Sequence, residues 1–169
     1  MVLNFPDGEP FVTSSVGYRS RPATDRETAN RLMLQVEIGG VKTEAVIDTG
    51  GIYFVCTAQI ANRLNLDEED ALDEDTVNLR GSSITGRLCR LLLRIQAEEG
   101  TSIELEVTAL IPRDTREGQW IEQLPCYLGW QGCLERLRFA IDPNTDTFYF
   151  GPPYELTPSI QKAGEEAIG

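Results

Sequence analysis

The stretch that decides the fold reads EAVIDTGGIYFVC and runs from Glu44 to Cys56. Its first half is apolar and predicts a buried strand, but the run ends in a carboxylate, Asp48, which Thr49 and Gly50 follow. Burying an unpaired carboxylate is costly, so an acidic residue at the end of a core strand is either well solvated or functional. The simpler alternative is a turn in which the Asp48 side chain caps its own backbone.

The residues just before Asp48 predict the strand that carries it. Apolar and polar positions alternate over residues 32–38 and again over residues 41–47, and Gly39 and Gly40 separate the two runs. Alternation with a period of two is typical of strands with one buried face, and a glycine pair suits a tight turn between them. We therefore expect a β-hairpin whose second strand ends at Asp48.

Apolar and turn-rich segments alternate through the rest of the chain. Residues 57–66 (TAQIANRLNL) have apolar positions at nearly helical spacing and predict a short helix. The segment RGSSITG (80–86) is small, polar and flanked by strand residues, so it predicts the tip of a hairpin. Residues 134–151 predict a helical turn and a last hairpin. This pattern favours a mainly β protein with its strands in a closed or sandwiched barrel.

Most of the strand signals fall within residues 29–151, which are expected to form one domain, since 169 residues are few for two domains. Residues 1–28 are rich in Pro, Gly, Ser and Arg and show little periodicity, so they are interpreted as an N-terminal arm outside the core. Residues 152–169 are interpreted as a C-terminal tail.

The composition argues against several classes of function. A formal net charge of -12 argues against nucleic acid and anionic membranes as partners. The chain has no His, which removes Ser-His-Asp triads, Cys-His nucleophile pairs and histidine metal sites. Its four cysteines form no CxxC pair and are expected to be packed thiols. Neither a metal nor a cofactor is predicted.

The chain also lacks the patterns of membrane and secreted proteins. It has no apolar run near the roughly 20 residues of a membrane span. Its first residues lack the basic start and apolar core of a signal peptide. We expect a soluble cytoplasmic protein, of bacterial origin.

Three of these segments, in their order along the chain, resemble the retropepsin-like aspartic proteases. They are VIDTGG (46–51) after a glycine-turned hairpin, RGSSITG (80–86) and CYLG (126–129). The resemblance implies a closed β-barrel of the retropepsin type with one or two short helices, and an aspartic-type endopeptidase. In such an enzyme two adjacent carboxylates share one proton and activate a water molecule that attacks the peptide carbonyl.

The second carboxylate is expected to come from a second molecule. Asp-Thr-Gly occurs once in this sequence. A single chain with two such motifs would need about twice this length, so chain length and the resemblance both imply a homodimer with twofold symmetry. One Asp48 from each subunit would then face the other. The substrate would be an extended peptide or protein segment, held by backbone hydrogen bonds.

The resemblance also assigns roles to other residues. Asp48 would be catalytic, and Thr49 and Gly50 would support its loop. Leu128 and Gly129 would pack beneath that loop. A hairpin tip would act as a flap that folds over the substrate. Its residues would be Arg80, Gly81, Ser82, Ser83 and Ile84.

Two residues depart from the family pattern. Gly51 and Ile52 stand where the family usually has Ala followed by a polar residue. The departure leaves open a catalytically inactive retropepsin-fold module that binds peptides or serves in assembly. A third interpretation is an unrelated small β-barrel in which Asp-Thr-Gly is accidental.

Overall fold

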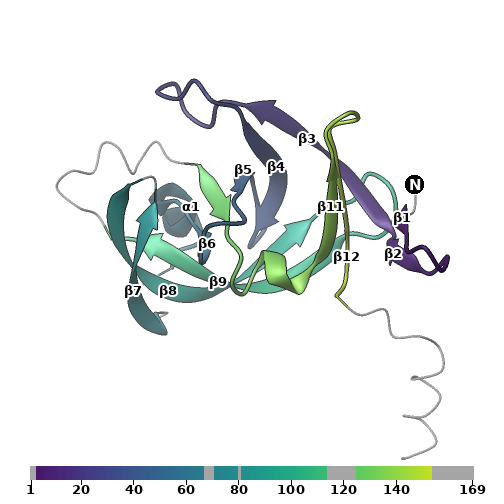
Figure 1. Cartoon of the computed structure of the whole chain (residues 1–169). Coiled ribbons are helices and arrows are strands. Elements are labelled where there is room, and N and C mark those ends of the chain that lie inside the picture. The colour runs from purple at the N-terminus through teal and green to yellow at the C-terminus, as the bar shows by residue number, and fades with distance from the viewer. Residues whose placement is uncertain (1–2, 67–70, 80, 114–124, 154–169) are drawn as a thin grey trace, which may run out of the picture.

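Strands make up most of the structure, a computed structural model that describes residues 3–66, 71–79, 81–113 and 125–153. Figure 1 shows them curving around a shared interior, with one short helix at the side. The mainly β class predicted from the sequence is confirmed.

The strands are, in chain order, β1 (Leu3–Asn4), β2 (Pro10–Val12), β3 (Ser14–Arg21), β4 (Arg31–Ile38), β5 (Val41–Ile47), β6 (Phe54–Val55), β7 (Asp73–Leu79), β8 (Ser82–Ile95), β9 (Ile103–Pro112), β10 (Cys126–Leu128), β11 (Arg138–Asp142) and β12 (Thr147–Gly151). The helical segments are α1 (Ala58–Arg63) and a 3-10 turn at Leu134–Arg136.

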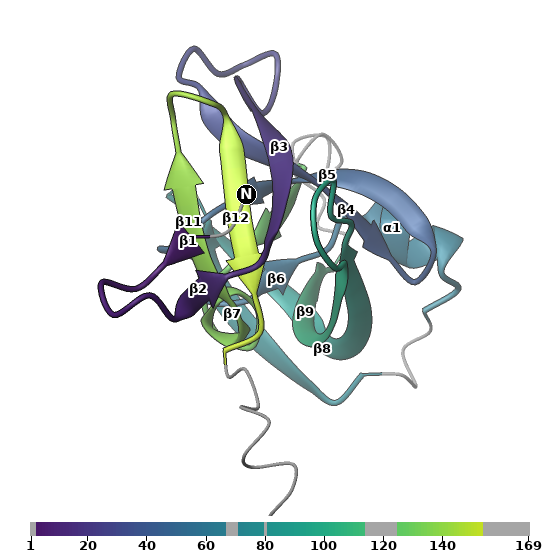
Figure 2. The same cartoon turned by 90° about the vertical axis from the view of Figure 1, so that its right-hand side faces the viewer.

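All of the strands except β1 and β2 belong to one sheet of 10 strands, in the order β11-β12-β3-β4-β5-β10-β6-β9-β8-β7. β4 also pairs with β8, where Ile38 lies opposite Leu93, so the sheet bends back on itself. The two perpendicular views in Figures 1 and 2 show the long β8–β9 pair as a curved ribbon on one side of the interior. A closed barrel stays a prediction.

A large apolar cluster fills the inside of the curved sheet. Its fully buried side chains include Leu34, Phe54, Leu93, Leu128 and Phe148, which come from five different strands. Burying one side chain of this size stabilises the fold by about 1.5–3 kcal/mol relative to leaving it exposed. The cluster therefore joins strands that lie far apart in the sequence, and it fixes the strand that leads to Asp48.

β4 and β5 form the hairpin that the sequence predicts. Their register places Ile38 opposite Val41 and leaves Gly39 and Gly40 as a two-residue turn. The φ angles of these glycines are +52° and +86°, in the left-handed region that glycine adopts without a steric penalty. The hairpin brings Asp48 to the end of a half-buried strand.

The short helix predicted after Asp48 is also present, as α1. Thr57 caps its N-terminus, because the Thr57 hydroxyl accepts a hydrogen bond from the Ile60 amide at 3.3 Å. Ile60 and Ala61 are the buried residues of the helix, and they anchor it to the large core cluster. No helix within the described residues is long and apolar enough to cross a membrane.

All four cysteines are buried, as expected of packed thiols. Burial raises the pKa of the Cys133 thiol to about 12. The pKa of Cys56 is raised as well, first by the hydrogen bond with the Cys126 side chain and then by burial. Both groups therefore stay protonated near neutral pH and contribute to packing rather than to chemistry.

The structure corrects the interpretation of residues 1–28 as an arm. β3 is an inner strand of the sheet and pairs with β12 on one side and β4 on the other. Val16 and Tyr18 of this strand are buried in the large core cluster. The core therefore begins well before the boundary predicted at residue 29. Most of the predicted tail, from residue 154 onward, lies outside the described residues.

Small and polar residues hide β3 in the sequence, where it reads SSVGYRSR (14–21). Ser14 is nevertheless buried. Its hydroxyl donates to the Thr101 carbonyl oxygen at 2.8 Å and accepts from the Thr101 amide at 3.0 Å. A buried hydroxyl with its donor and acceptor roles both filled costs little. A serine can therefore occupy a core position that hydropathy alone would assign to the surface.

Removal of residues 1–28 is expected to abolish folding, because it deletes β3 and leaves β4 and β12 with unpaired edges inside the sheet. Thermal unfolding followed by circular dichroism measures this. Removal of residues 1–9 is the matched control. It takes away β1, which within the described part of the chain pairs only with β2, and should leave a cooperative transition. A cooperative transition in the chain that lacks residues 1–28 would contradict the role of β3 as an inner strand that the fold requires.

Candidate active site

β10 holds the loop that carries Asp48. It runs parallel to β5, with Leu128 opposite Ile47, the residue just before Asp48. The Asp48 amide then donates to the Leu128 carbonyl oxygen at 3.0 Å, which extends the pairing by one more bond. Leu128 is fully buried, so the first residue of the loop is fixed to the core.

The Asp48 side chain is half-buried and bonded within its own loop. The Gly50 amide donates to Asp48 Oδ1 at 3.2 Å, and the Gly51 amide donates to the Asp48 carbonyl oxygen at 3.1 Å. Such self-capping is what a simple turn requires, and a catalytic carboxylate in a tight loop needs it as well. The surroundings of the carboxylate therefore decide between the two interpretations. Thr49 lies exposed on the same loop.

Gly51 leaves the carboxylate space that a side chain would take. A Cβ at this position would stand 3.1 Å from Asp48 Oδ2 and 3.3 Å from Asp48 Cγ, tighter than most real contacts. The next residue, Ile52, is 47% exposed. Its carbonyl oxygen and that of Gly51 accept hydrogen bonds from the amides of Gln131 and Trp130, both at 2.7 Å. The loop is thus tied to the segment that follows β10.

Gly129 lies where two backbones cross. A Cβ on Gly129 would stand 2.1 Å from the Tyr53 carbonyl oxygen and 2.6 Å from its carbonyl carbon, which is impossible without moving the chain. Gly129 is buried and follows directly on β10. This position excludes every side chain, so the glycine is a requirement of the close approach beneath the Asp48 loop.

A cavity of about 240 Å³ opens beside Asp48. Its lining residues come from β4, β5, β7, β10 and the Asp48 loop: Arg31, Val46, Ile47, Asp48, Gly50, Gly51, Asn78, Leu79 and Tyr127. Among these described residues Asp48 is the one that carries a carboxylate. The described part of the chain contains no group of three ligand-type side chains that could hold a metal ion.

The hairpin predicted around RGSSITG is formed by β7 and β8, and its end reaches this cavity. Asn78 and Leu79, the last residues of β7, line the cavity together with Asp48. Leu79 lies opposite Ser82 in the register. Gly81 has a φ of +79°, and its amide donates to Asn78 Oδ1 at 3.0 Å. Arg80 lies outside the described residues.

The predicted hairpin residues point in different directions. Gly81, Ser82 and Ser83 are exposed, whereas Ile84 is buried. Ile84 belongs to a second apolar cluster, which joins the hairpin to the strands around Asp48. The members of this cluster are Met33, Val46, Val55, Val77, Leu79, Ile84, Leu110 and Tyr127. The hairpin therefore rests on the same strands that carry the Asp48 loop.

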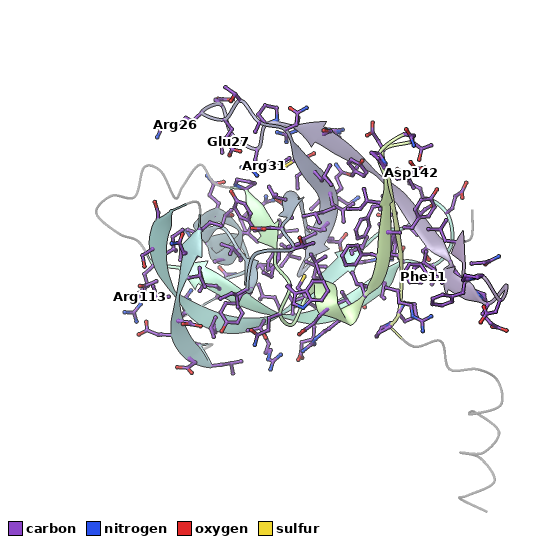
Figure 3. The ribbon with its side chains drawn as sticks, viewed as in Figure 1. Phe11, Arg26, Glu27, Arg31, Arg113 and Asp142 are labelled. Carbon is purple, nitrogen blue, oxygen red and sulfur yellow. The ribbon has the colours of Figure 1, made fainter. Side chains whose placement is uncertain are left out.

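Sequence reasoning missed Arg31 as a residue of the site. It is the first residue of β4 and lines the cavity with Asp48. Its Nε lies 3.1 Å from Glu27 Oε2, and Figure 3 shows the two side chains next to each other. A single arginine at the start of an alternating stretch belongs to no motif, so only the folded chain reveals that it lies near Asp48.

A second missed contact connects the Asp48 loop with the β7–β8 hairpin. The Tyr53 hydroxyl donates to Asp75 Oδ2 at 2.7 Å. This bond is the main cause that raises the pKa of Tyr53 and lowers that of Asp75. It therefore keeps the phenol protonated and the carboxylate charged. No sequence pattern pairs these two residues, which are 22 positions apart.

Comparisons with known proteins support the fold. No protein-family model and no curated protein matches the chain. A solved retropepsin-like aspartic protease from Rickettsia conorii is similar in structure, with a TM-score of 0.50 and 16% identity over 82% of this chain and 90% of that protein. The fold of the chain is retropepsin-like. This confirms the predicted resemblance for the fold.

A second solved structure is less similar. The retroviral protease-like domain of Ddi1 from Leishmania major has a TM-score of 0.42 and 16% identity, over 75% of this chain and 98% of that one. At such identities the comparison concerns the fold alone. In this retropepsin-like chain the roles expected of Asp48, Thr49, Gly50, the hairpin tip, Leu128 and Gly129 stay predictions.

Substitution of Gly129 by Ala is expected to destabilise the fold by about 3 kcal/mol or more, because its Cβ would collide with backbone rather than with a movable side chain. Urea unfolding measures the loss. Gly17→Ala is the control, since a Cβ there would make only ordinary contacts, with the Glu98 side chain at 3.7 Å and the Asp146 carbonyl oxygen at 4.0 Å. Equal stability of the two variants would contradict the backbone crossing at Tyr53.

Proposed function

We propose that the chain is an aspartic endopeptidase that acts as a homodimer, with one Asp48 from each subunit in the active site. The observation that carries the proposal is the position of Asp48. Its half-buried carboxylate ends a core strand, lines a cavity beneath the β7–β8 hairpin, and belongs to a retropepsin-like fold. An accidental turn would not require this combination.

Two carboxylates at hydrogen-bonding distance cannot both ionise cheaply, so the pair holds one proton. The charged Asp48 takes a proton from water as the water oxygen attacks the carbonyl carbon of the substrate. The protonated Asp48 donates its proton to the carbonyl oxygen. When the carbon–nitrogen bond breaks, the Asp48 that took the water proton passes it to the leaving nitrogen. The other Asp48 takes a proton from a hydroxyl of the tetrahedral intermediate as that oxygen becomes a carbonyl, so the pair again holds one proton.

The count of carboxylates supports the homodimer. Asp48 supplies the single carboxylate among the described lining residues, and Asp-Thr-Gly occurs once in the sequence. A twofold axis close to Asp48 would bring a second copy of the same group to the site. The hydroxyl of Thr49, exposed in one subunit, would then be available to join the two loops.

An extended peptide is the substrate that this arrangement favours. The β7–β8 hairpin would act as a flap whose exposed residues Ser82 and Ser83 cover the peptide and exclude water. Backbone groups would hold the peptide, and apolar lining residues such as Val46 and Leu79 would receive alternate side chains.

Asp48→Asn is expected to lower peptide cleavage by about 10²- to 10⁴-fold, because the amide cannot act as general base. Hydrolysis of a broad peptide library at acidic to mildly acidic pH measures this. Asp7→Asn is a matched control, since the Asp7 carboxylate also accepts a backbone hydrogen bond from the residue two positions on, at 3.1 Å. It should cleave like the unmodified chain.

Cleavage that persists in Asp48→Asn would remove Asp48 from its role. If the unmodified chain binds peptides but cleaves none of them, the inactive peptide-binding or assembly module is the better function. The departures at Gly51 and Ile52 are the features that favour that second candidate.

Mixing the two forms tests the shared site directly. If each active site needs two Asp48 residues, an equal amount of Asp48→Asn subunit, allowed to exchange, should lower the activity of a fixed amount of unmodified chain to about half. Sedimentation velocity on the same samples should show dimers. Activity that is unaffected by the Asp48→Asn subunit, or that comes from a strict monomer, would rule out an active site shared by two subunits.

A further inference from the structure

The outer part of the β7–β8 hairpin leaves the rest of the sheet at a defined point. β7 and β8 pair from Asp73 opposite Leu88 to Leu79 opposite Ser82. The described pairing of β8 with β9, by contrast, begins only at Gly86. One more hydrogen bond, from the Arg113 amide to the Thr85 carbonyl oxygen at 3.0 Å, extends the β8–β9 pairing by one residue toward the hairpin tip. The hairpin therefore projects beyond β9 from Thr85 toward its tip.

β8 and β9 lie very close together at Gly86, where the hairpin begins to project beyond β9. A Cβ on Gly86 would stand 2.5 Å from the Ile111 carbonyl oxygen, so β8 and β9 approach here more closely than a side chain allows. Asp75 lies directly opposite Gly86 in the register of β7 and β8. Asp75 therefore marks the root of the projecting hairpin.

Tyr53 holds this root. Its hydroxyl donates to Asp75 Oδ2 at 2.7 Å, and its carbonyl oxygen lies against Gly129, beneath the Asp48 loop. One residue thus touches both the support of the loop and the root of the hairpin. Tyr53 packs against the second apolar cluster, which fixes its ring while the hydroxyl reaches Asp75.

The ion pair near this root is a weaker restraint. Arg113 forms an ion pair with Glu74, but both side chains are about half exposed, at 58% and 48%. Exposed ion pairs contribute little because water screens them and their long side chains lose freedom. The Tyr53–Asp75 bond is partly buried and has a charged acceptor, which makes it the stronger restraint.

We propose that Tyr53 is a positioning residue, whose hydrogen bond to Asp75 sets the angle at which the β7–β8 hairpin stands over the Asp48 cavity. The inference rests on the proposed function for its effect on substrate, but the restraint itself belongs to the single chain. Losing the bond would reduce the fraction of molecules with a closed hairpin and weaken the apparent affinity for peptide by that fraction.

Tyr53→Phe tests this in the full-length chain, since it removes one oxygen atom and keeps the ring. Amide hydrogen exchange at residues 76–79 and 81–84 should become faster by about three- to tenfold, while exchange in the β4–β5 hairpin stays unchanged. KM for extended peptides should rise by about the same factor, with kcat nearly constant.

Two further variants provide the comparison. Asp75→Asn keeps an oxygen that accepts from Tyr53, so its effect should be intermediate. Asp73→Asn removes the same charge from the same strand, but the Asp73 carboxylate accepts from the neighbouring Glu74 amide. That variant should exchange and bind like the unmodified chain. In Asp75→Asn the pKa of Tyr53, followed by NMR of the labelled ring, should move down toward its ordinary value.

Each result decides one question. Unchanged exchange in Tyr53→Phe overturns the inference, and so does faster exchange throughout the chain, which marks a general loss of stability. A fall in kcat at constant KM overturns it too, because Tyr53 would then act on the chemistry. If the unmodified chain cleaves no peptide, the proposed function fails, while the exchange data still decide whether Tyr53 holds the hairpin.

Discussion

The arrangement around Asp48 depends on a single constraint, the insertion of β10 between β5 and β6. This strand is only three residues long, yet it runs parallel to β5 and antiparallel to β6, and all three residues are buried. Its last carbonyl oxygen accepts from the Asp48 amide, and the glycine after it passes against the Tyr53 backbone. Because so few residues carry these contacts, each of them contributes strongly to the position of the loop. The site is therefore an outcome of backbone packing first and of side-chain chemistry second.

The parts of the fold that depend on residues close together in the sequence could be predicted. The β4–β5 hairpin is encoded by alternation and two glycines, and α1 by its spacing and its Thr57 cap. β3 could not be predicted, because its buried Ser14 satisfies its hydroxyl group with Thr101, which lies 87 positions away. Hydropathy describes a residue by its type, whereas burial depends on the partners that the folded chain provides. The order of the strands in the sheet cannot be predicted from local sequence patterns for the same reason.

Some residues of the candidate site could likewise be predicted from the sequence, and others could not. Asp48 and the hairpin tip stand out because a charge after an apolar run and a cluster of small residues are visible in the sequence alone. Arg31 and Tyr53 do not stand out, since their importance comes from what lies across the cavity or on another strand. The resemblance supplied the order of the segments, and the structure added the contacts between them. Gly129 was expected from a motif, but the physical reason for it, a crossing of two backbones, required the folded chain.

The close approach of Gly51 to the Asp48 carboxylate has a consequence for the energetics of a reaction at this loop. The Gly50 amide holds one oxygen of the side chain, and the other oxygen lies where a Cβ on Gly51 would crowd it. The hydrogen bond favours one orientation of the carboxylate, so part of the torsional entropy of this side chain is already lost when the chain folds. An arriving water molecule or peptide would meet a carboxylate that is preorganised and would not have to order it first.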